Sequence, residues 1–132
     1  MANTVRIRKL SDGPREAVIH LHLKSDGASG ELTDQVVVDV STLVPVPVSI
    51  GVRAVWYAQT GFESMLEFDA TVDTPIWRLP QSTDTNFLDF GAFGVISSDA
   101  GAGATGDVIL TTTGFTSVED EGTLILRVIK KF

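Results

Sequence analysis

The chain has 132 residues, a net charge of −7 and a pI near 4.6, and it contains no cysteine. This length suits one domain, residues 1–132, and the apolar content is too high for a disordered chain. The negative charge argues against nucleic-acid binding, because clustered Lys and Arg side chains bind phosphates. The lack of cysteine excludes disulfides and thiolate metal ligands, and it favours a reducing compartment.

Apolar and polar residues alternate with a period of two through most of the chain, which is typical of half-buried antiparallel strands. In chain order the alternating runs are residues 4–9, 18–24, 36–40, 49–58, 65–73 and 123–129, and a β-branched run covers 107–113. Asp-Gly pairs and prolines separate several of these runs, as turns require. The pattern predicts an all-β, jelly-roll-like antiparallel β-sandwich of about eight or nine short strands, with a closed barrel as the alternative.

Three segments depart from the alternation. A short helical turn is expected near residues 41–44, and the polar residues 80–87 predict an exposed loop. Within the small residues 97–106, the three glycines at 101, 103 and 106 fit the spacing of the dinucleotide-binding motif. That motif must lead from a strand into a helix, whereas the next run predicts a strand. We therefore expect a flexible loop here and no nucleotide cofactor.

Two polar clusters are candidates for functional sites. His20 and His22 alternate on one strand and are expected on one face, but a structural metal site would need further ligands, so a solvated pair is favoured. Glu67, Asp69 and Asp73 are expected on one face of another strand, where paired carboxylates could serve glycoside hydrolysis. A polar outer face is the favoured interpretation, so no catalytic, cofactor-binding or metal-ligating residue is predicted.

Only some of the aromatic residues are candidates for a ligand-stacking platform. Trp56 shares the phase of Ile50 and Val52, which predicts that it lies in the core. Trp77 or Tyr57, if exposed, would be the stacking platform of a carbohydrate-binding or adhesin-like module. No segment is apolar enough for a signal peptide or a membrane span, so no membrane partner is expected.

Residues 1–15, 20–27 and 30–34, together with residues 105–115 and 122–131, resemble small virion structural proteins of tailed bacteriophages, notably phages of aquatic bacteria. The resemblance implies a non-enzymatic β-sandwich used in assembly, either a head decoration (cement) protein or a neck or tail protein. It also implies a virion protein that is made in the bacterial host cytoplasm. Its partners would be the major capsid protein or other virion proteins, and it would form a homo-oligomer, a trimer or dimer.

Basic residues gather near both ends of the chain. The rest of the chain is acidic, above all its second half, where residues 67–132 hold four basic and ten acidic groups. If the end strands lie side by side, they form a basic patch that could dock on an acidic partner; solvated strand faces with edge-protecting lysines are the favoured alternative. The predicted contact residues are Arg6, Arg8, Lys130 and Lys131 at the ends, and Asp99, Gly101 and Gly103 in the glycine-rich loop.

Overall fold

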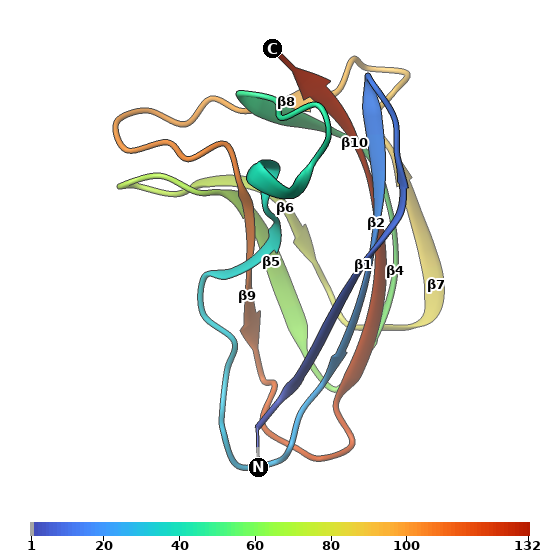
Figure 1. Ribbon diagram of the computed structural model, residues 1–132. Helices are drawn as coiled ribbons and strands as arrows, with labels where there is room; N and C mark the ends of the chain where they lie inside the picture. The colour runs from blue at the N-terminus through green and yellow to red at the C-terminus, as the bar shows by residue number, and fades with distance from the viewer. Residues whose placement is uncertain (1) are drawn as a thin grey trace.

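The computed structural model describes residues 2–132, and its regular secondary structure is almost entirely antiparallel strands (Figure 1). The strands are β1 (Thr4–Asp12), β2 (Glu16–Lys24), β3 (Gln35–Val38), β4 (Ser49–Thr60), β5 (Glu63–Phe68), β6 (Thr74–Leu79), β7 (Ser82–Asp89), β8 (Ile96–Ser97), β9 (Val108–Thr113) and β10 (Glu121–Lys131). A single 3₁₀ turn, η1 (Val40–Thr42), falls close to the helical turn expected from the sequence.

Two separate sheets pack face to face, so the fold is a sandwich (Figure 1). The larger sheet has the order β1-β2-β10-β4-β7, with β8 also paired to β4, and the smaller sheet has the order β3-β9-β5-β6. β1 and β10 both pair with β2 in one sheet, so β2 separates the two end strands, which do not lie side by side as the basic-patch hypothesis required. The all-β antiparallel sandwich is confirmed, with ten strands instead of eight or nine.

The core consists of the inward-facing residues of both sheets. Ile19, Leu21 and Leu23 on β2 face Leu66 and Phe68 on β5, and all are almost completely buried. Alternating strands of this kind bury one apolar face each, which stabilises a sandwich by roughly 25 cal/mol for every Å² of apolar surface removed from water. The two sheets thus leave their outer faces for contacts with other molecules.

A β-bulge in β4 changes which side chains reach that outer face. Ala54 pairs with Arg127 and Val52 with Val128, so Arg53 is an extra residue in β4. The extra residue reverses the alternation beyond it. Tyr57 therefore points into the core and Trp56 lies half-buried on the outer face. The prediction of a core Trp56 is wrong because a period of two cannot be extrapolated through a bulge.

Two predicted loops also differ in the structure. Residues 82–87 belong to β7, an edge strand whose polar side chains are exposed, so its polarity marks an edge position and not a loop. The segment before β9 is irregular, as predicted, but it is tied to the turn between β5 and β6. Thr71 N donates to Ala102 O at 3.1 Å, and Asp69 N donates to Asp107 O at 3.0 Å. The two segments project together from the side of the smaller sheet (Figure 1).

No helix in residues 2–132 has the length and apolarity needed to cross a membrane.

Candidate functional site

The outer face of the larger sheet carries one continuous row of directly paired residues across five strands. Arg8 on β1 pairs with His20 on β2, and His20 pairs with Ile125 on β10. Ile125 pairs with Trp56 on β4, and Trp56 pairs with Phe87 on β7. Directly opposed residues project from the same face of a sheet. The row therefore runs from a basic edge on β1 to an aromatic edge on β7.

The aromatic end of this row is preorganised. The rings of Trp56 and Phe87 stack with centroids 4.4 Å apart and an interplanar angle of 13°. Ala54 and Ala58 are the neighbours of Trp56 on the same face of β4, and their small side chains leave the indole standing above the sheet. A stacked pair with one half-buried and one exposed ring presents a rigid apolar surface at low cost in conformational entropy.

A groove lies beside Trp56, over the centre of the sheet. Its volume is about 580 Å³, and its walls are mainly apolar, formed by Leu10, Val18, Trp56, Tyr57, Ala58 and Ile125, with Thr85, Thr123, Glu16 and Arg127 as polar members. Arg127 Nη2 donates to Glu16 Oε1 at 2.7 Å, so the two charged residues that line the groove form an ion pair. This hydrogen bond lowers the pKa of Glu16, while burial of the carboxyl opposes the shift.

A second aromatic surface lies at the β6–β7 side of the sandwich and is called the aromatic flank. It comprises Trp77, Phe87, Phe90 and Phe93, which border a hollow of about 540 Å³. Trp77 and Phe90 contact each other with ring centroids 5.1 Å apart, and Phe93 is 89% exposed. Contiguous exposed apolar side chains mark interaction surfaces far more often than scattered ones do.

The predicted contact residues fall into different environments. Arg6 and Arg8 are exposed on β1, and neither has an ion pair within residues 2–132. Lys131 is exposed as well. Lys130 is not available to a partner: its side chain is fully buried and donates to Asp12 Oδ1 at 2.6 Å. Its inclusion in an exposed basic patch is therefore wrong, because alternate residues of β10 face the core.

The glycine-rich loop offers less free surface than its composition suggests. Asp99 is exposed and Gly101 has open space around its Cα. Gly103, with φ +77°, packs so closely on Thr71 that a Cβ would come within 2.2 Å of the Thr71 hydroxyl. The glycine at 103 is thus required by an internal contact. The strand expected after this motif is confirmed as β9, so the glycines lead into a strand and not into a helix.

The two histidines share the outer face of β2, as predicted. His22 Nε2 lies 3.2 Å from Glu121 Oε2, and its Nδ1 lies 3.4 Å from Thr123 Oγ1. Burial lowers the pKa of His20, and the nearby charges of Arg8, His22 and Arg6 lower it further. His20 is therefore harder to protonate than a free imidazole, and Arg6 and Arg8 place permanent positive charge beside it.

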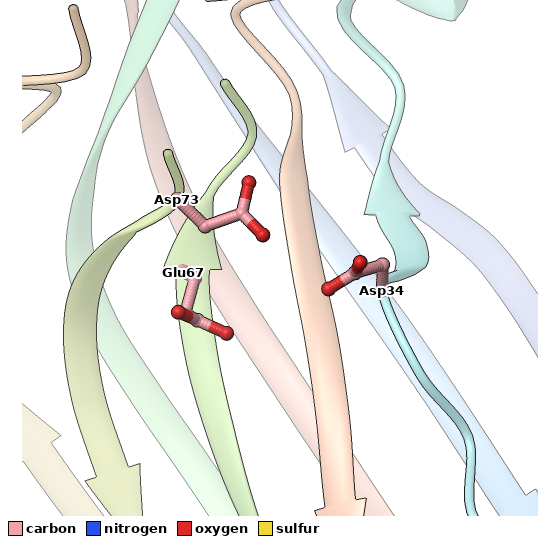
Figure 2. Close-up of side chains that lie close together, drawn as sticks. All are labelled: Asp34, Glu67 and Asp73. Carbon is pink, nitrogen blue, oxygen red and sulfur yellow. The ribbon is translucent and has the colours of Figure 1, made fainter. Parts of the chain in front are cut away.

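Three carboxylates meet on the outer face of the smaller sheet, and Figure 2 shows that they come from three separate segments. One oxygen each of Asp34, Glu67 and Asp73 lies within 4.8 Å of the others. Burial raises the pKa of Glu67, and the charges of Asp73 and Asp34 raise it further. Such a group could bind a divalent cation through oxygen, although exposed acidic clusters are common without one.

This arrangement differs from the predicted row of Glu67, Asp69 and Asp73. β5 ends at Phe68, so Asp73 lies beyond a turn and not on the same strand. Asp69 turns away and accepts a hydrogen bond from Thr105 Oγ1 at 2.8 Å. Asp34, which replaces it in the cluster, was not predicted, because only strand pairing between β9 and its two neighbours brings residues 34 and 67 together.

No protein-family model matches the chain, and no curated protein matches it in sequence. Among solved structures, a cupin superfamily protein from Desulfitobacterium hafniense is similar with a TM-score of 0.36 and 10% identity, over 100% of this chain and 82% of that one. A variant of a family 29 carbohydrate-binding module has a TM-score of 0.40 and 9% identity, over 98% of this chain and 80% of that one. These likenesses are too distant to indicate a ligand.

Proposed function

We propose that the chain is a non-enzymatic structural domain of a tailed-bacteriophage particle, a head decoration protein that binds the shell. The observation that carries this proposal is the aromatic flank, where Trp77, Phe87 and Phe93 are exposed together beside a hollow. Buried aromatic anchors dominate the binding energy of protein interfaces, so an exposed group of them is suited to docking. The resemblance of both chain ends to virion structural proteins supplies the class of partner.

The position of the flank supports docking between proteins. β6 and β7 are edge strands of different sheets, so the flank lies where both sheets end. A partner seated here would cover apolar side chains and two sheet edges at the same time. Neck and tail positions in the particle remain alternatives to the head, because the same surface would serve any of them.

The test is rebinding of the purified chain to phage particles that have been stripped of it, followed by co-sedimentation. Phe93→Ser should weaken binding by about tenfold or more, as loss of a central aromatic anchor does. Val118→Ser removes another exposed apolar side chain, far from the flank in the β9–β10 turn, and should bind normally. Absence of the chain from particles, or wild-type binding by Phe93→Ser, would overturn the proposal.

Carbohydrate binding is the second candidate, and the exposure of Trp77 beside the hollow favours it. Tyr57, the other platform considered, is only 4% exposed and cannot stack on a sugar. A glycan array followed by titration of Trp77→Ala separates the two functions. Saturable glycan binding that Trp77→Ala abolishes would establish this candidate, and an array without binders would remove it.

A further inference from the structure

The groove on the larger sheet combines an apolar floor with uncompensated positive charge on one side. Ile125 and Trp56 form part of the floor, and the paired row continues through His20 to Arg8 at the edge. Arg6 lies two residues before Arg8 on β1, and it pairs with His22 on the same face. Glu16 is paired with Arg127 and Glu121 with His22, so Arg6 and Arg8 are charges at this edge of the groove that no described carboxylate pairs with.

The opposite side of the molecule carries a surface of complementary chemistry. Val72 in the turn between β5 and β6 is 77% exposed, and it lies next to Asp73 of the carboxylate cluster. No Lys or Arg forms an ion pair with Asp34, Glu67 or Asp73 within the described part of the chain. Hydrogen bonds from Thr71 N to Ala102 O and from Thr105 N to Asp69 O hold this turn against the neighbouring loop.

We propose that the groove on the larger sheet is the docking site for the β5–β6 turn of a second copy of this chain. Val72 of one copy fills part of the groove beside Trp56 of the next, and the carboxylates of Asp34 and Glu67 face Arg6 and Arg8. The net charge of −7 makes two copies repel each other in most orientations. Contact between the basic edge and the acidic cluster is an orientation in which the attraction of opposite charges offsets this repulsion.

The two surfaces lie on opposite sheets, so each copy offers one groove and one turn in different directions (Figure 1). A contact between unlike surfaces is heterologous: it builds closed rings where the rotation between copies closes, and open chains where it does not. This goes beyond the proposed function, since it needs no phage partner and its variants leave the aromatic flank unchanged; the flank meets the groove only where Phe87 stacks on Trp56. The two proposals therefore fail independently.

The experiment is sedimentation velocity of the purified full chain over a wide concentration range at low and high salt. The wild type should associate beyond a dimer. Raising the salt concentration until the charges across the contact are screened should weaken association by about tenfold. Association driven by apolar contact alone would instead strengthen with salt, because screening removes the repulsion between acidic copies. A wild type that stays monomeric at the highest soluble concentration, or that associates more strongly in salt, would overturn the proposal.

Two charge variants then test the named surfaces. Arg6→Glu with Arg8→Glu reverses the charge beside the groove. Asp34→Asn with Glu67→Lys removes the negative charge beside the turn. Each variant alone should be monomeric. An equimolar mixture should form a dimer and nothing larger, because only one intact groove and one intact turn remain between the two proteins. Asn is used at position 34 because Asp34 has φ +50°, a conformation that Asn tolerates.

Matched controls change the same charges elsewhere. Arg15→Glu and Glu119→Lys lie in exposed turns outside both surfaces and should associate like the wild type. If Glu67→Lys prevents folding, judged by circular dichroism, Asp34→Asn with Glu67→Gln replaces it and should weaken association in the same direction. Wild-type association by both surface variants, or a mixture that remains monomeric, would refute the assignment.

Discussion

Lys130 and Asp12 form a buried ion pair between the last and first strands, with Lys130 Nζ donating to Asp12 Oδ1 at 2.6 Å. The same ammonium donates to Val44 O at 2.8 Å, and Asp12 Oδ2 accepts from Val44 N at 2.9 Å. Lys9 approaches the same carboxylate at 3.6 Å. The pair therefore joins β1, β10 and the segment after η1 at one end of the sandwich.

Removing one member of this pair should be costly. Lys130→Met leaves the largely buried Asp12 carboxylate without its main partner, and we expect a loss of about 2 kcal/mol or more in the free energy of unfolding. The double variant Asp12→Asn with Lys130→Met should lose less than the sum of the single variants. Urea unfolding measures these differences. Lys131→Met, on the exposed face, should stay within about 0.5 kcal/mol of the wild type.

The same pair should make stability depend on acid pH. The hydrogen bond from Lys130 lowers the pKa of Asp12 below its ordinary value of 3.8, against the opposing effect of burial. Because the carboxylate is more acidic in the folded state, its stabilisation is complete above pH 3.8 and is lost as the pH falls through the lowered pKa. Unfolding between about pH 5 and about pH 2 should show a steeper loss for wild type than for Asp12→Asn. Parallel curves would contradict the pairing.

Glu67 should behave in the opposite sense. Burial and the charges of Asp73 and Asp34 raise its pKa, so its ionised form destabilises the folded state above that pKa and the penalty disappears as the pH falls through it. Glu67→Gln should therefore stabilise the protein at neutral pH by about 0.5 kcal/mol, the scale expected for partly exposed charges. Its advantage should fade in acid. Thermal unfolding at several pH values checks this, with the exposed Glu119→Gln as the control; destabilisation by Glu67→Gln would contradict it.

The placement of the two tryptophans can be checked by fluorescence. Trp56 lies half-buried on the outer face and Trp77 is 43% exposed, so both indoles should be accessible to acrylamide in the folded protein. Trp77→Phe leaves Trp56 as the sole tryptophan, and its emission should still be quenched readily. A blue-shifted emission that resists quenching in this variant would place Trp56 in the core and contradict the bulge at Arg53.

Strand periodicity was enough to predict the fold class, because burial of alternate side chains is a local property of each strand. It failed at Trp56, where a bulge set by the pairing of β4 with β10 reverses the alternation. It also failed at residues 82–87, because a polar strand at a sheet edge has the composition of a loop. The aromatic flank could not be predicted from a sequence pattern, because Trp77 precedes β7 in the chain and Phe93 follows it.

The sequence by itself determined the all-β class, the position of several turns and the shared face of His20 and His22, since these follow from the alternation of neighbouring residues. Only the tertiary structure decided that Lys130 is buried, that Asp34 joins Glu67 and Asp73, and that Trp56 stands beside an open groove. The physical reason is that each of these depends on pairing between strands far apart in the chain. Register across a sheet is fixed by the burial and pairing of many residues together.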